Sequence, residues 1–274
     1  MKIRNLLIIT LLLATGCRKD WLDAKPNKAL VIPQTLADYQ ALLDNPSMNT
    51  NQPSMSMVGD GDYGITDANY TALGYPPEKG AYTWAATEDF YGGQANYEWI
   101  SAYARILQTN IVLDGLSGQN NNVTASALFF RSYNYYELAQ QYCKAYDAAT
   151  AGSDLGLPLR LSANVNLNVS RSTLQATYEQ LTGDVLKALP LLPVKPLFPT
   201  RPSKPAAYGL LARIYLSQEN YGQALLYADS CLQLQNGLMD FNTLSLTAAT
   251  PIAYFNQEVI FHSQLTSYQS GNPP

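Results

Sequence analysis

Apolar side chains recur at helical spacing along most of the chain, beginning near residue 35. Thr35 is a suitable N-cap, and Asp38 follows three residues later in the pattern of a capping box. The apolar residues behind this cap recur every three or four positions, as Leu36, Tyr39, Leu42 and Leu43. The pattern predicts a helix that begins after Thr35 and buries one face.

Longer apolar stripes of the same spacing predict further helices, over 95–115, 124–146 and 172–189. Ser172 or Thr173 would cap the last of these, and Pro190 would close it. In residues 205–234 the pattern is similar to a tetratricopeptide repeat, which is a pair of closely packed helices. The matching residues are Tyr208, Leu211, Ala212, Tyr215, Tyr221 and Ala224. We therefore expect a mostly α fold of tetratricopeptide-like helical repeats with long loops.

Two stretches depart from this helical pattern. Residues 45–93 are rich in Gly, Pro, Asn, Asp, Ser and Tyr, and they predict long ordered loops. Loops of such length in a compact domain are usually functional. Glu258–Ser263 alternates weakly between apolar and polar residues and predicts one strand. Because a lone strand needs pairing partners, we expect the helical-repeat domain, residues 35–274, to be incomplete at its C-terminus.

Residues 1–17 have the pattern of a secretory leader. Two basic residues, Lys2 and Arg4, precede the apolar run Leu6–Leu13. This run is too short to span a bilayer, which requires about 20 residues, but it fits the core of a signal peptide. Small residues then lead directly into Cys17, and this ending resembles a bacterial lipoprotein signal.

The leader divides the N-terminal part of the chain into two segments. We expect residues 1–16 to be a lipoprotein signal peptide that is removed, and residues 17–34 to be a tether. The thiol of Cys17 would then carry a lipid that anchors the protein on a membrane. The alternative is an ordinary signal peptide followed by an unmodified cysteine.

The composition narrows the possible chemistry. Charged residues make up 14% of the 274, the net charge is −4, and a basic run is absent, which argues against a nucleic-acid partner. One histidine and three cysteines are too few for a histidine-based metal centre or a disulfide framework. A serine-histidine-aspartate triad would have to use His262, for which a structural role is favoured. We therefore predict no catalytic residue, no metal and no cofactor.

Short motifs follow one another in a fixed order from the leader to the predicted strand. They are Cys17–Pro26, Tyr82–Trp84, Trp99–Leu113, Arg131–Leu138, Leu155–Pro158, Arg171–Ala188, Lys204–Tyr221 and Glu258–Phe261. In their order and spacing these segments resemble the SusD/RagB family of outer-membrane nutrient-binding lipoproteins. Members of this family usually run to about twice this length, so the resemblance is to the N-terminal, tetratricopeptide-like half.

The resemblance implies binding without catalysis. Such proteins are anchored by lipid in the outer membrane and face the cell exterior. They capture oligosaccharides and deliver them to a TonB-dependent, SusC-like transporter, on which the helical repeats pack. Two alternatives stay open: a peptide-binding member of the family, and a protein-interaction scaffold of the same complex without a ligand. A surface hydrolase would need two separated carboxylates that face a cleft, and the sequence shows no such pattern.

Aromatic residues in the loops are the candidate ligand contacts. Sugar rings present C–H faces that pack on aromatic rings, and the amphipathic side chains of tyrosine and tryptophan suit such ligands. Trp84 is the first candidate for a stacking platform, and Tyr82, Tyr75 and Tyr63 follow it. The alternative for each of these residues is packing of the loop onto the helical core.

Overall fold

The fold is mostly α, as predicted. The computed structural model describes residues 32–62, 64–86 and 90–265. Residues 35–274 form one structural unit, and residues 1–34, of which only 32–34 are described, form another. The helices of the larger unit are α2 (Leu36–Leu43), α3 (Met55–Val58), α4 (Asp67–Ala72), α5 (Pro76–Tyr82), α6 (Tyr97–Gly115), α7 (Asn122–Tyr142), α8 (Leu174–Ala188), α9 (Lys204–Ser217) and α10 (Tyr221–Leu234). Its two strands are β1 (Leu155–Pro158) and β2 (Arg171–Thr173).

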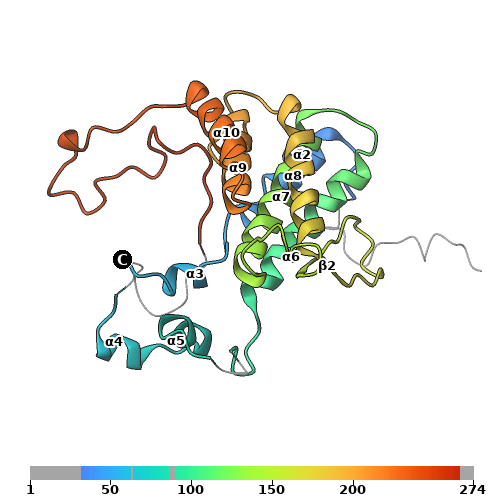
Figure 1. Cartoon of the computed structure of the whole chain (residues 1–274). Coiled ribbons are helices and arrows are strands. Elements are labelled where there is room, and N and C mark those ends of the chain that lie inside the picture. The colour runs from blue at the N-terminus through green and yellow to red at the C-terminus, as the bar shows by residue number, and fades with distance from the viewer. Residues whose placement is uncertain (1–31, 63, 87–89, 266–274) are drawn as a thin grey trace, which may run out of the picture. The chain divides into compact units, whose positions relative to one another are not determined.

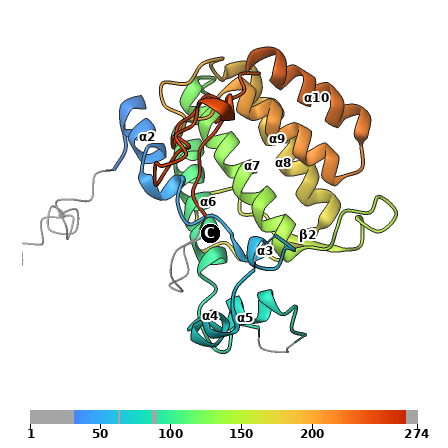
Figure 2. The same ribbon diagram turned by 90° about the vertical axis from the view of Figure 1, so that its left-hand side faces the viewer.

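Helices α6 to α10 pack in the order in which they occur along the chain. Helix α6 lies against α7, α7 against α8, α8 against α9, and α9 against α10 (Figures 1 and 2). Packing between sequence neighbours is typical of helical-repeat proteins. The pair α9–α10 is the predicted tetratricopeptide-like unit, in which Ala224 is buried and a Cβ at Gly209 on α9 would lie 3.9 Å from Cys231 Sγ on α10. The thiol of Cys231 on α10 donates to the backbone oxygen of Pro205 on α9 at 3.2 Å.

Polar side chains cap the helix starts. Thr35 and Asp38 form the predicted capping box, with Asp38 N–H donating to Thr35 Oγ1 at 3.2 Å and Thr35 N–H to Asp38 Oδ2 at 2.9 Å. Thr173, one of the two predicted caps, accepts an amide hydrogen bond at the start of α8. Helix α7 begins slightly earlier than predicted, because Asn121 rather than Thr124 accepts the free amide groups of its first turn.

The segment 45–93 is more structured than predicted, because helices α3, α4 and α5 lie within it. Thr66 caps α4 by accepting from an amide group of its first turn at 3.3 Å. Pro76 opens α5 at a position where the missing N–H needs no partner. Such short helices show no apolar stripe, so periodicity does not reveal them.

The apolar pattern does not predict the small sheet formed by β1 and β2. These strands pair antiparallel, with Leu155 opposite Thr173. A glycine at position 156 is required for the close approach, because a Cβ there would lie 2.2 Å from Thr177 Oγ1 and 2.3 Å from Thr173 O. Strands of four and three residues are too short to show the alternation on which the prediction relies.

The strand predicted at Glu258–Ser263 is wrong. This segment is a turn followed by bends and irregular chain, and the nearest strand-type pairing among the described residues is a single bridge between Gln52 and Leu265. Its apolar residues pack on helices instead. The ring centroid of Phe261 lies 5.1 Å from that of Phe129 and 5.5 Å from that of Tyr133, in edge-to-face geometry. The weak alternation therefore reflects packing on α7 rather than pairing in a sheet.

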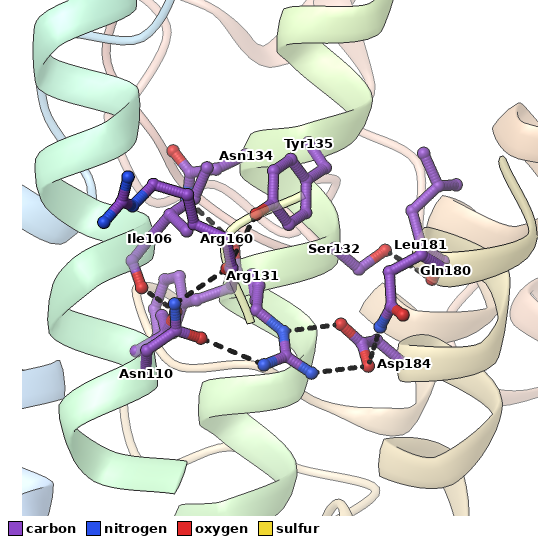
Figure 3. Close-up of polar contacts among 12 residues, drawn as sticks. Ile106, Asn110, Arg131, Ser132, Asn134, Tyr135, Arg160, Gln180, Leu181 and Asp184 are labelled. Atoms are coloured by element: carbon purple, nitrogen blue, oxygen red, sulfur yellow. Dashed lines mark hydrogen bonds and ion pairs between the residues drawn. The ribbon is translucent and has the colours of Figure 1, made fainter. Parts of the chain in front are cut away.

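A buried ion pair joins α7 to α8 (Figure 3). Arg131 Nε donates to Asp184 Oδ2 at 2.7 Å, and Arg131 Nη2 donates to Asp184 Oδ1 at 2.8 Å. The Asp184 side chain is 1% exposed, and Gln180, one turn earlier, donates to the same carboxylate at 2.9 Å. Because the two parallel bonds match the planar guanidinium to the carboxylate, they fix the position of one helix against the other.

The same guanidinium also reaches α6. Arg131 Nη1 donates to Asn110 Oδ1 at 3.0 Å, and Asn110 Nδ2 donates to the backbone oxygen of Arg160 at 2.8 Å (Figure 3). The hydroxyl of Tyr135 on α7 donates to that same oxygen, also at 2.8 Å. One connected polar network therefore holds α6, α7, α8 and the segment that follows β1.

Removal of the carboxylate from this network would leave a buried cation unpaired. We expect Asp184→Ala to lower the free energy of unfolding by about 3–5 kcal/mol, as measured by chemical denaturation. Lys144→Ala is a matched control, because it breaks a salt bridge whose lysine is largely exposed, and it should have little effect. Equal losses in the two variants would contradict a special role for the buried pair.

Candidate functional site

Trp84 combines high exposure with a fixed position. It follows helix α5, and its side chain is 82% exposed. Its indole Nε1 donates to the backbone oxygen of Gly59 at 2.8 Å, so the ring is held while most of its surface stays open to solvent. An aromatic ring that is already held in place loses little conformational entropy when a ligand stacks on it.

The backbone at Trp84 is strained. Its φ of 51° lies in the left-handed region, which residues other than glycine rarely adopt. The amide groups of Trp84 and Ala85 close the turn after α5, by donating to the carbonyl oxygens of Ala81 and Gly80 at 3.3 and 2.9 Å. Strain of this kind persists only where the surroundings hold it, and it concentrates at functional sites. Glu219 after α9 has a similar φ of 57°, so the conformation fixes the backbone at Trp84 as a helix C-terminal turn does and does not by itself mark a functional residue.

A hollow of about 320 Å³ is lined by Thr83 and Ala85, the residues on either side of Trp84 in sequence, but not by Trp84 itself. Its lining comes from α4, α5 and the segment after α5, and includes Tyr70, Lys79, Thr83, Ala85 and Phe90. Lys79 is the charged member of this lining. Its Nζ lies 5.8 Å from the ring centroid of Tyr70 and donates to the backbone oxygen of Thr71 at 3.2 Å. Both of these partners are neutral groups, and the other described residues of the lining are apolar or neutral and polar.

Tyr82 and Tyr75 support the segment that carries Trp84. The hydroxyl of Tyr82 accepts from Ile65 N–H at 3.4 Å, and its ring centroid lies 5.8 Å from that of Tyr70. Tyr75 donates from its hydroxyl to the backbone oxygen of Ala95 at 3.2 Å, and burial raises the pKa of Tyr75 to about 12. These contacts hold α4 and α5 in place, and both side chains are only partly exposed.

Glu98 is a buried carboxylate that the sequence analysis does not single out. Its Oε1 accepts from Ser54 N–H at 2.6 Å, from Met55 N–H at 3.2 Å and from the Ser54 hydroxyl at 3.2 Å. Its Oε2 accepts from the side-chain amide of Gln141 on α7. Glu98 lies in the first turn of α6 and binds free amide groups at the start of α3, where a negative charge is favourable.

Helix α3 connects this carboxylate to the exposed tryptophan. Glu98 binds the start of α3, and Gly59 at the end of α3 supplies the carbonyl oxygen that holds the indole of Trp84. Helix α3 also packs against α5, which ends two residues before Trp84. The long helix α6 thus positions Trp84 through two short helices, although 14 residues separate Glu98 and Trp84 in sequence.

The remaining predicted site residues have no described geometry. Tyr63 and Cys17 lie outside the described residues, as does most of the tether.

Within residues 32–62, 64–86 and 90–265 there is no group of three or more His, Cys, Asp or Glu side chains placed to hold a metal ion. His262 makes ring contacts with Tyr254 and Phe255 at centroid distances of 4.8 and 5.0 Å.

Most of the chain matches the model of a known protein family. The family model of SusD-like proteins described as starch-binding and associating with the outer membrane matches residues 20–216. The match covers more than half of the chain and includes Trp84, Glu98 and the network around Arg131. The chain belongs to the SusD-like family. The description is one of binding rather than catalysis, which agrees with the expectation from sequence, and it places this SusD-like family at the outer membrane.

Solved SusD-like structures share the fold of this chain. One from Bacteroides fragilis has a TM-score of 0.59 at 21% identity, over 84% of this chain and 56% of its own length. One from Bacteroides thetaiotaomicron has a TM-score of 0.57 at 22% identity, over 73% and 46%. A laminarin-binding SusD-like protein has a TM-score of 0.52 at 17% identity, over 78% and 47%. At these identities the likeness shows the fold alone.

This SusD-like chain spans about half the length of those solved structures. No curated protein is found to match it. The ligand and the partners of the chain therefore have to be argued from its own residues, of which Trp84 has the clearest geometry.

The link from Glu98 to Trp84 can be tested in this SusD-like protein. Glu98→Ala removes every acceptor that Glu98 offers to α3, so we expect a loss of about 3 kcal/mol in stability and faster amide hydrogen exchange at residues 54–59. Glu98→Gln is the matched control. Its amide oxygen can take over the bonds of Oε1, and its amide nitrogen can donate to Gln141 Oε1, which lacks a partner among the described residues.

If Glu98→Gln and Glu98→Ala accelerated exchange at residues 54–59 to the same extent, the carboxylate would not be what holds α3. Unchanged exchange in both variants would show that α3 is held by its packing on α5 alone.

Proposed function

We propose that this chain captures oligosaccharides at the outer membrane, with Trp84 as its stacking platform. The single observation that carries the proposal is the exposed indole, held by Gly59 in a strained backbone conformation. A family described as starch-binding and a fold shared with a laminarin-binding structure support the same class of ligand.

The chemistry of the Trp84 surface suits a neutral sugar. One face of a pyranose ring presents C–H groups that pack on an indole, and its hydroxyl groups point outward to neighbouring polar atoms. The hollow lined by Thr83 and Ala85, which flank Trp84 in sequence, also has Tyr70 and apolar surface in its lining. The Thr83 hydroxyl donates to Lys79 O at 2.9 Å, so it would serve as an acceptor for a sugar hydroxyl. Lys79, whose Nζ also contacts Tyr70 and the backbone oxygen of Thr71, can donate a further hydrogen bond from this lining to a sugar hydroxyl. Tyr82 and Tyr75 serve as supports of the platform in this proposal.

Glycan binding through Trp84 predicts a specific loss of affinity. Trp84→Ala should weaken binding of laminarin-derived or starch-derived oligosaccharides by about tenfold or more, measured by calorimetric titration. The fold should remain intact, because the side chain is mostly exposed. Tyr221→Ala is the control, since Tyr221 is also an exposed aromatic residue but lies at the start of α10. An unchanged titration curve for Trp84→Ala would refute the assignment.

A second candidate function is supported by the surface of α10. Leu225, Leu226 and Leu232 are large apolar residues that are more than half exposed on this helix. Exposed apolar clusters mark interaction sites. In the proposed glycan-capture function this helix packs on a TonB-dependent, SusC-like transporter, which receives the ligand. In the alternative, a scaffold without a ligand of its own, the same surface would carry the whole function. Absence of binding to any oligosaccharide in a panel would favour the scaffold.

Lipid anchoring completes the proposal. No helix in the described ranges is long and apolar enough to cross a membrane. We infer that the thiol of Cys17, after removal of residues 1–16, carries lipid and holds the protein in the outer membrane, facing the exterior. More than one acyl chain is needed for stable anchoring.

The anchor can be tested through its thiol. Cys17→Ser removes the acceptor of the lipid, so we expect the variant to move from the membrane fraction to the soluble fraction after cell lysis. Cys143→Ser, which changes a different cysteine, should leave the distribution unchanged. Retention of the Cys17→Ser variant in the membrane fraction would show that a lipid on this residue is not what holds the protein at the membrane.

A further inference from the structure

A second hollow lies on a different part of the molecule from Trp84. Its volume is about 310 Å³, at the lower end of the range of roughly 300–1,000 Å³ typical of small-molecule sites. Three segments that are distant in sequence line it: the end of α2, the residues before α9, and residues 254–264. The lining includes Asp44, Asn49, Thr200, Tyr254, Phe255 and His262.

Aromatic rings form one wall of this hollow. The ring of His262 lies 4.8 Å from that of Tyr254 and 5.0 Å from that of Phe255, between centroids. Tyr254 and Phe255 meet edge to face at 5.6 Å. Their side chains are 61% and 55% exposed, so much of each ring remains available for contact with a ligand. Two exposed aromatic rings beside polar groups are a suitable surface for the C–H face of a sugar.

Hydrogen bonds hold the floor of the hollow. Asn49 Nδ2 donates to the backbone oxygens of His262 and Thr200, at 2.8 and 3.1 Å. The backbone amide of Gln264 donates to Asn49 O at 2.7 Å, and that of His262 donates to Pro199 O at 2.9 Å. The side chain of Asn49 is thus the link between the three segments. The lining is therefore organised before any ligand arrives, which lowers the entropic cost of binding.

The remaining polar groups of the hollow are suited to hydrogen bonds with uncharged hydroxyl groups of a ligand. Among the described residues, the ring nitrogens of His262 and the hydroxyl of Thr200 have no hydrogen-bond partner. Burial lowers the pKa of His262 below its usual value, so at neutral pH the ring offers one donor and one acceptor. Both oxygens of Asp44 bind Arg201, at 2.8 and 2.5 Å, and this pair compensates the charges at the rim. A neutral polyol is therefore better suited to this hollow than an ion.

We propose that this hollow is a second saccharide site, in which one neutral sugar unit packs on Phe255 and Tyr254 and hydrogen-bonds to His262 and Thr200. The proposal rests on the proposed function, because it assumes that the chain handles glycans. It does not depend on Trp84, which is not among the residues that line the hollow.

The sole histidine of the sequence provides a direct reporter of this site. Laminaribiose and maltose serve as probes in a titration followed by the NMR signals of the His262 ring. We expect a saturable shift of these signals, and the same shift in the Trp84→Ala variant. Phe255→Ala and Thr200→Val keep the reporter but remove a ring or a hydroxyl, and each should weaken the apparent affinity by about tenfold. Phe241→Ala, an exposed aromatic residue outside the hollow, is the matched control and should leave it unchanged.

The outcomes separate this proposal from the proposed function. A saturable His262 shift that Phe255→Ala weakens supports the second site, even if Trp84→Ala has no effect on glycan affinity. If the probes bind in a Trp84-dependent manner without moving the His262 signals, the second site is overturned and the proposed function stands. A shift that is equal in the wild type and in Phe255→Ala also overturns the second site. If neither probe binds anywhere, both proposals fail together.

Discussion

The bidentate ion pair between Arg131 and Asp184 is the constraint on which the helical frame depends. Both groups are buried, and burial of charge is costly unless every bond is made. Here the guanidinium also binds Asn110 on α6, and the carboxylate also binds Gln180. The bonds have fixed directions, whereas apolar packing does not. The network therefore selects one relative position of α6, α7 and α8. The tetratricopeptide-like pair α9–α10 stacks against these helices.

Helix α6 contacts the buried polar network at one point along its length and helix α3, which leads to the candidate site, at another. Asn110 joins it to the buried network, and Glu98, twelve residues earlier, binds the start of α3. At 1.5 Å per residue the two points are about 18 Å apart along the helix. A stiff helix fixed at one end thus sets the position of α3, of Gly59 and finally of Trp84 at the other. This arrangement explains how an exposed ring can be held firmly in a segment of short helices.

Sequence predicts the long elements well because each buries a stripe of apolar residues and begins at a capping side chain, as at Thr35 and Thr173. Prediction from sequence fails where contacts between distant segments determine the local structure. Glu258–Ser263 alternates like a strand, yet Phe261 packs on α7 and the described pairing amounts to one bridge at Leu265. Glu98 looks like an ordinary helical glutamate, and its role depends on a segment 44 residues away. The aromatic composition around Trp84 indicates a binding surface, but only the structure separates the exposed ring from the supporting Tyr82 and Tyr75.

The positions of the charged residues in the fold bear on the class of ligand that the proposed surfaces can bind. Only 14% of the residues are charged, and several of them are used inside the fold. Arg131 and Asp184 neutralise each other, Glu98 binds backbone amides, and the buried Arg105 donates to backbone oxygens in the loop after α2. The described surfaces around Trp84 and His262 are therefore built mainly from rings, hydroxyls and amides, with Lys79 in the first lining and Asp44, paired with Arg201, in the second. In the proposed function, a neutral glycan gains from such groups through stacking and hydrogen bonding, whereas an ionic ligand would lose hydration that neutral groups replace only in part.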